Sequence, residues 1–68
     1  MKPTAALYAD EVSLGMTIRY GLRTCSVESI TEGVGSIEFR GLGDDPVKGK
    51  YMINHVITVP LFDLVEVF

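Results

Sequence analysis

Two residues with side chains that could act in catalysis occur once each in this sequence, His55 and Cys25. An imidazole, with an unperturbed pKa of about 6.5, suits a general base. His55 alternates with Ile53 and Ile57, however, and no catalytic motif ties it to a serine or an aspartate, so we expect it at the rim of the core. Cys25 lies in a β-type run, where a buried thiol behaves as a small apolar group. The sequence therefore predicts no catalytic residue and a protein that is not an enzyme.

The glycine-rich segment Gly41-Leu42-Gly43-Asp44-Asp45 has two chemical interpretations, a phosphate-binding loop and a divalent-cation loop. A phosphate loop requires backbone N–H groups at the start of a helix with a lysine close behind, whereas here two acids and a proline follow. A calcium loop needs about six oxygen ligands at repeating positions, and two adjacent carboxylates supply too few. A single cysteine also excludes an internal disulfide and a cysteine-based zinc cluster. We expect a solvated polar connection over residues 41–50, with no metal and no cofactor.

Positive charge falls mostly in two clusters, each beside a tyrosine. Small barrels use aromatic and cationic side chains together to bind single-stranded nucleic acid. Acidic residues adjoin both clusters, and the formal net charge of −3 opposes binding to phosphates. A mixed solvated surface is therefore the preferred interpretation, and nucleic-acid binding is the alternative. The residues of that alternative surface are Arg19, Tyr20, Arg23, Arg40, Lys48, Lys50 and Tyr51.

Two-residue alternation of apolar and polar side chains dominates the chain, and no segment has a convincing helical period. The alternation predicts strands at 16–20, 25–30, 36–40, 51–59 and 64–68, with a bulge near Ser29 and a turn over 31–33. Pro60 ends the fourth strand and begins a short helical turn. Residues 4–12 fit either a single helical turn or an extended arm. Five short strands of this kind favour a small antiparallel barrel.

Two segments resemble parts of SH3-like small barrels. Residues 9–18, Ala-Asp-Glu-Val-Ser-Leu-Gly-Met-Thr-Ile, are similar to the opening of that fold, and residues 59–67 are similar to its helical turn and final strand. Ala6-Leu7-Tyr8 also resembles the first aromatic motif of SH3 domains. The resemblance implies an all-β, five-stranded antiparallel SH3-like barrel with one short helical turn near Pro60. It implies no binding of proline-rich peptides, because the chain has no tryptophan.

We expect one domain over residues 1–68, with 1–12 as an arm or turn and 16–68 as the barrel. The apolar start is too short for a signal peptide, and polar residues interrupt the apolar stretch 51–68, so no membrane segment is predicted. These features predict a cytoplasmic protein. Small chains of this composition are often accessory proteins of phages or mobile elements, which is a further expectation.

The end of the chain carries more apolar residues than one buried face requires. Twelve of the 18 residues from Tyr51 to Phe68 are apolar, and they occupy both faces of the predicted strands. A sheet with one solvated face alternates cleanly, so a second apolar face is covered by the N-terminal arm, by a second copy or by a protein partner. We therefore expect a non-enzymatic interaction module that binds a protein or itself. The predicted contact residues are Met52, Val56, Val65, Val67 and Phe68.

Overall fold

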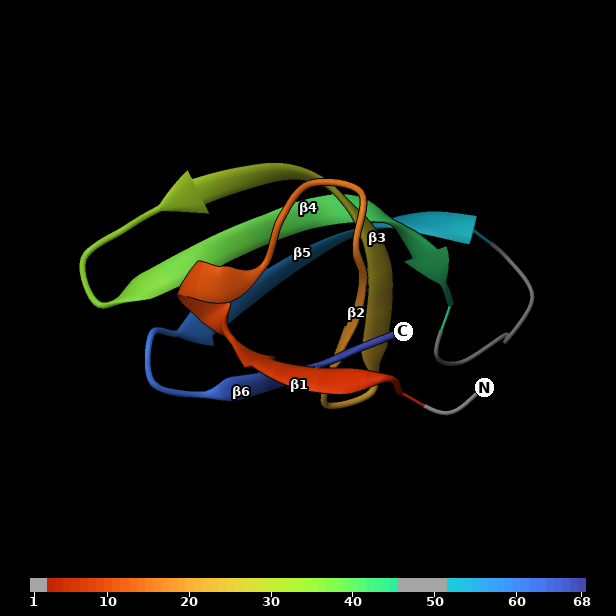
Figure 1. Cartoon of the computed structure of the whole chain (residues 1–68). Helices are drawn as coiled ribbons and strands as arrows, with labels where there is room; N and C mark the ends of the chain where they lie inside the picture. Colours follow the sequence, from red (N-terminus) through yellow and green to blue (C-terminus); the bar gives the residue numbers. More distant parts are fainter. Residues whose placement is uncertain (1–2, 46–51) are drawn as a thin grey trace.

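The structure, a computed structural model that describes residues 3–45 and 52–68, is a single antiparallel sheet with one short helix (Figure 1). The strands follow the order β1-β6-β2-β3-β4-β5 across the sheet. The all-β prediction is confirmed. The elements are β1 (Ala5–Tyr8), the 3-10 helix η1 (Ala9–Glu11), β2 (Thr17–Tyr20), β3 (Arg23–Glu32), β4 (Ser36–Asp44), β5 (Met52–Pro60) and β6 (Leu64–Val67).

The described chain has six strands rather than the five expected, because the N-terminal arm joins the sheet. Strand β1 pairs with β6 over its whole length, from Ala5 opposite Val67 to Tyr8 opposite Leu64. The arm is thus extended and then helical, since η1 follows β1 directly. The helical turn expected near Pro60 is not a helix. The chain makes a single hydrogen-bonded turn there, in which the Asp63 N–H donates to the Pro60 carbonyl at 3.0 Å.

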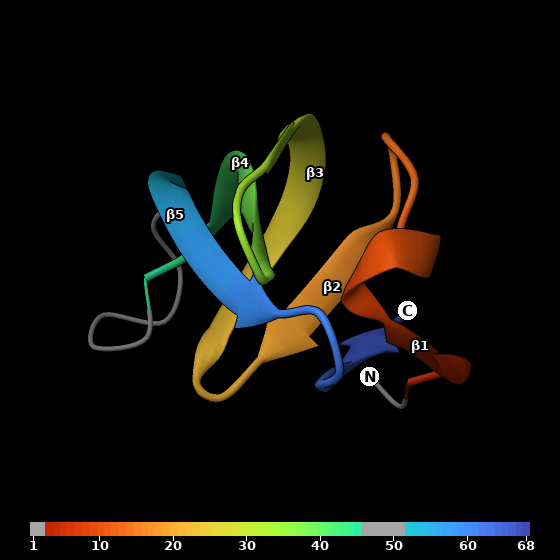
Figure 2. The same cartoon turned by 90° about the vertical axis from the view of Figure 1, so that its left-hand side faces the viewer.

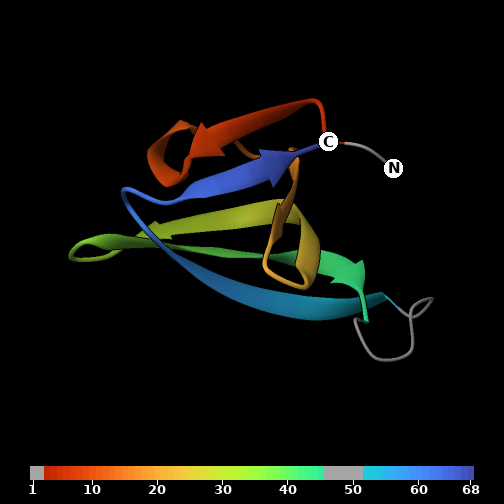
Figure 3. The same cartoon turned by 90° about the horizontal axis from the view of Figure 1, so that it is seen from below.

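The sheet curves strongly but does not close into a barrel. Strands β1 and β5 lie at opposite borders, as the side view and the view from below show (Figures 2 and 3). Four strands, β2 to β5, form an antiparallel meander, and β6 then returns to pair with β2, with Ile18 opposite Val67. The expectation of a closed five-stranded barrel is therefore replaced by an open, six-stranded curved sheet.

The prediction of a loop from residue 41 onward is wrong for its first part, because β4 continues to Asp44. Gly41 pairs with His55 and Gly43 with Ile53. Both glycines are buried, and a Cβ atom on either would overlap a backbone carbonyl oxygen of β3. Glycine thus permits β3 and β4 to approach so closely that the sheet can bend here. The remainder of the predicted connection, residues 46–50, lies outside the described residues.

Strand β3 contains the irregularity that the sequence predicts. Val27 is opposite Gly41 and Ser29 is opposite Arg40, so Glu28 is an extra residue on β3. This bulge lies next to the predicted position at Ser29, and bulges of this kind increase local twist.

The core fills the concave side of the sheet. Side chains of alternate strand residues meet there. Ala9 of η1 and Val12, just after η1, add two more buried side chains. Phe39 is the largest fully buried side chain, and Ile18, Ile37 and Val59 are also fully buried or nearly so. The buried apolar residues are Ala9, Val12, Ile18, Cys25, Val27, Ile37, Phe39, Ile57, Val59, Val65 and Val67.

Candidate functional site

The predicted contact residues divide into two groups. Met52 and Val56 are exposed on the convex side of β5, at 59% and 43% of their full accessible areas. Val65 and Val67, at 1% and 7%, belong to the core, so the prediction that they contact a partner is wrong. The physical reason is that β6 lies between β1 and β2, and its alternate residues point into the curved sheet.

Phe68 follows β6 and is half-buried. Its backbone N–H donates to the Thr17 carbonyl at 2.9 Å, which fixes the residue beside β2. The guanidinium carbon of Arg19 lies 5.2 Å from the centre of the Phe68 ring, a distance typical of a cation–π contact. The ring therefore already has an intramolecular partner.

Strand β4 adds a residue that the sequence analysis missed, Leu42, which is 38% exposed. Leu42 is opposite Asn54, and it is therefore diagonal to both Met52 and Val56 on the same side of the sheet. Long side chains at such diagonal positions come within reach of each other. Leu42 follows Glu38 and Arg40 at two-residue spacing, so it lies on the same side of β4 as they do. A sequence prediction that continued this strand through Gly41 and Gly43 would have found Leu42 on the exposed side. We call Leu42, Met52 and Val56 together the β4–β5 surface.

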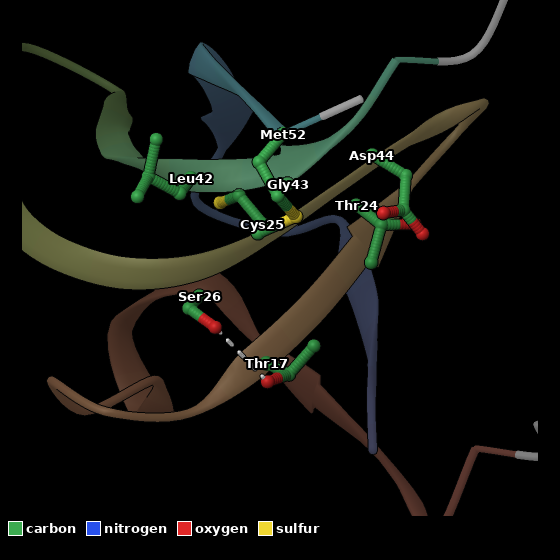
Figure 4. A pocket seen from close by; sticks show the side chains of 8 residues that line it. All are labelled: Thr17, Thr24, Cys25, Ser26, Leu42, Gly43, Asp44 and Met52. Atoms are coloured by element: carbon green, nitrogen blue, oxygen red, sulfur yellow. Dashed lines mark hydrogen bonds between the residues drawn. The ribbon is translucent and has the colours of Figure 1, made fainter. Parts of the chain in front are cut away.

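A small open cavity of about 130 Å³ adjoins this surface (Figure 4). Leu42 and Met52 form part of its lining, and hydroxyl groups and one carboxylate form the polar part. A hydrogen bond of 3.4 Å joins Thr17 Oγ1 and Ser26 Oγ within it. The cavity therefore offers hydroxyl groups and a carboxylate within a mostly apolar lining. Its lining residues are Thr17, Thr24, Cys25, Ser26, Leu42, Gly43, Asp44 and Met52.

Cys25 and His55 both occupy structural positions. Burial, and then the nearby Glu28 carboxylate, raise the pKa of the Cys25 thiol, so its reactive thiolate is disfavoured. His55 is buried, and its Nε2 donates to the Asp44 carbonyl oxygen at 2.9 Å. This bond fixes the imidazole beside the end of β4, as expected for a residue at the rim of the core. Within residues 3–45 and 52–68, no three histidine, cysteine or acidic side chains lie close enough to bind a metal ion.

The basic residues do not form a continuous patch in the described part of the chain. Arg19 binds Glu66 with three hydrogen bonds of 2.9 to 3.1 Å. The Nε atom of Arg40 donates to Glu38 at 2.6 Å. Strand β3 lies between the strands of Arg19 and Arg40, so the two arginines do not lie on adjacent strands.

The other members of that hypothesis have different surroundings. Arg23 donates from one terminal nitrogen to the Val56 carbonyl oxygen at 3.2 Å. The Tyr20 hydroxyl donates to Asp63 Oδ2 at 2.5 Å, and this hydrogen bond, followed by burial and the Asp63 charge, raises the pKa of Tyr20. Lys48, Lys50 and Tyr51 lie outside the described residues.

Comparisons of the chain with protein-family models, with curated proteins and with solved structures find no significant match. The geometry is therefore the basis for any functional conclusion. In the residues that the structure describes, no helix has both the length and the hydropathy needed to span a bilayer.

Proposed function

We propose that this chain is a non-enzymatic interaction module that binds a protein through the β4–β5 surface. The observation that carries the proposal is the grouping of Leu42, Met52 and Val56, three exposed apolar side chains from two adjacent strands. Burial of apolar area is the main source of affinity at protein interfaces, at about 25 cal/mol per Å². The adjoining cavity, with hydroxyl groups in a mostly apolar lining, supplies polar groups that orient a partner.

We also propose that the fold is a variant of the SH3-like small barrels. The four-stranded meander followed by a turn and a returning last strand supports this relationship. The departures are the additional strand β1 and the open edge at β5. The relationship does not by itself indicate a ligand, because folds of this kind support many functions.

The test is affinity capture from a cell lysate with the wild-type chain and two aspartate variants, each run with and without nuclease. In Val56→Asp the new carboxylate lies opposite Arg40, which makes an opposite-charge pair and favours retention of the fold. The matched control is Val34→Asp, at a fully exposed position in the β3–β4 turn.

The proposal expects one protein to be retained by the wild-type chain and by Val34→Asp, and to be lost with Val56→Asp, with or without nuclease. Equal capture by all three chains would show that the β4–β5 surface is not the contact. Capture that disappears with nuclease would instead favour the arginine, lysine and tyrosine surface of the alternative hypothesis.

A further inference from the structure

The two border strands of the sheet are also its two strands without charged side chains. Met52–Pro60 and Ala5–Tyr8 contain no lysine, arginine, aspartate or glutamate, whereas β2, β3, β4 and β6 each carry at least one. The one titratable group of β5, His55, is buried. Soluble proteins commonly place charged residues on border strands to prevent pairing with another chain. Strand β5, at nine residues, lacks this protection over its whole length.

The backbone groups that β5 presents at its open side can be assigned from three hydrogen-bonding observations. The Val56 carbonyl oxygen accepts a hydrogen bond from Arg23, which is not part of β4, so the backbone groups of Val56 point to the open side of β5. The Leu61 N–H donates to the carbonyl of Gly35, the residue just before β4. The backbone N–H and C=O groups of the odd-numbered β5 residues therefore point toward β4. Pro60, which has no N–H, shares the parity of Val56, so its missing donor costs the β4–β5 ladder nothing. Because N–H and C=O groups alternate along a strand, Asn54, Val56 and Thr58 present theirs at the open side.

A groove of about 550 Å³ runs beside this open side, between β5 and the β2–β3 turn. Leu22, at the tip of that turn, lines the groove and is 86% exposed. Gly21, with φ of 64°, gives the turn its conformation and directs Leu22 outward. The groove thus has the backbone of a border strand on one side and an exposed apolar side chain on the other.

We propose that a second copy of this chain occupies the groove, adding its own β5 antiparallel to the first so that the two sheets become continuous. This inference goes beyond the proposed function, because it uses the open side of β5 and Leu22 rather than the β4–β5 surface. Each copy carries a formal charge of −3, so charge repulsion opposes pairing least at a strand that carries no charged side chain, and β5 is such a strand. A neutral strand that meets itself about a twofold axis places no like charges of its own opposite each other.

Strand β1 is a poorer site for the same pairing. It has four residues, and the N–H of Tyr8 is already donated to Glu11 Oε1 at 3.0 Å. Nine residues of β5 extend about 30 Å, and the side of a strand about 10 Å deep gives roughly 300 Å² per copy before Leu22 is counted. A standard specific interface buries about 800 Å² per partner, so the dimer is expected to be weak and concentration-dependent.

Arg23 controls access to the pairing surface. Its guanidinium occupies the Val56 carbonyl, which the second strand needs as an acceptor, and among the described residues that line the groove Arg23 alone is charged. Arg23 must therefore leave that carbonyl when the dimer forms. Removal of its side chain strengthens dimerisation, because it removes both the competing donor and the repulsion between two arginines near the axis.

The first test is sedimentation equilibrium over a wide range of protein concentration, with four variants. Thr58→Pro removes an N–H on the open side and leaves the β4 ladder intact, and Thr58→Ala is its matched control. We expect Thr58→Pro to raise the dimer dissociation constant at least about tenfold, which corresponds to about 1.4 kcal/mol, with Thr58→Ala close to wild type. Leu22→Glu, at an exposed position, is expected to weaken the dimer without changing the unfolding midpoint, and it decides the question if Thr58→Pro does not fold. Arg23→Ala is expected to strengthen it.

The second test is amide hydrogen exchange at low and high protein concentration. The Asn54, Val56 and Thr58 amides are expected to gain protection as concentration rises, whereas Ile57 and Val59 amides are protected throughout. A chain that is monomeric at millimolar concentration, or equal exchange of the first three amides at both concentrations, overturns the inference.

The proposed function can fail or survive separately from the dimer. A monomer that loses a captured protein on Val56→Asp refutes the dimer and retains the interaction module. A dimer that captures no other protein supports self-association as the use of this part of the sheet.

Discussion

Gly41→Ala is the substitution that tests the bend of the sheet most directly. An added Cβ would lie 2.7 Å from the Ser26 carbonyl carbon and would overlap the attached oxygen. Cβ atoms in real structures essentially never come within 3.0 Å of such atoms, so the backbones of β3 and β4 would have to separate by well over an ångström. Overpacking against mobile side chains costs about 1–3 kcal/mol, and a backbone obstacle places this variant at or above the upper end.

The expected loss is large relative to the whole stability of the domain. At 0.05–0.15 kcal/mol per residue, a chain of 68 residues has a free energy of unfolding of roughly 3–10 kcal/mol. We therefore expect Gly41→Ala to lose about 3 kcal/mol or more and to be partly or wholly unfolded at 25 °C. Urea unfolding followed by circular dichroism measures this, with the midpoint and slope fitted together.

Gly33→Ala provides the matched control. Its φ is outside the left-handed region, and the nearest atom to an added Cβ is 3.6 Å away, an ordinary contact. This variant is expected to be unchanged or stabilised by about 0.4–1 kcal/mol, because alanine restricts the unfolded chain. If Gly41→Ala and Gly33→Ala unfold at the same urea concentration, β3 does not approach Gly41 as closely as described, and our explanation of the bend is wrong.

Two further predictions concern polar contacts. Glu66→Gln removes the ion pair with Arg19 and is expected to lower the free energy of unfolding by about 0.5–1 kcal/mol, a small loss because the pair is partly exposed. The difference in free energy from wild type should shrink in 1 M salt. An unchanged difference would contradict an electrostatic origin. The hydrogen bond from Tyr20 to Asp63 favours the neutral phenol, so the raised pKa of Tyr20 contributes stability that is complete below the unfolded pKa of about 10 and is lost as pH rises through the folded value. Absorbance titration should show one tyrosine ionising above pH 10 in the wild type and at lower pH in Asp63→Asn, and identical titrations would refute the coupling.

The arginine contacts bear on the nucleic-acid alternative. A phosphate-binding surface needs guanidinium groups that are free to meet the ligand. Arg19 and Arg40 each bind a carboxylate within the chain, which offsets their charge locally. A nucleic acid would have to compete with both ion pairs, so we favour the protein-interaction proposal.

The local alternation of the sequence was sufficient for the middle of the fold. The inward positions of Ile37 and Phe39 and of Ile57 and Val59 follow from period-two patterning with polar residues between them. The bulge beside Ser29 was also predictable, because two apolar residues at odd spacing cannot share a face without an extra residue. In these stretches a polar residue separates the two inward apolar residues, so the local pattern and the final structure agree.

Tertiary structure decided the parts in which the local pattern is ambiguous or depends on a distant strand. Leu64 and Phe68 compete with Val65 and Val67 for the inward face of β6, and only pairing with β1 and β2 selects the valines. Gly41 and Gly43 indicate a loop by local propensity, yet close approach to β3 places them in a strand. The sequence by itself thus determined that the chain is all-β and which side of each central strand is buried, because side-chain alternation is a local property. The border strands, the bend and the exposed β4–β5 surface were decided by register and strand order, which depend on residues far apart in the chain.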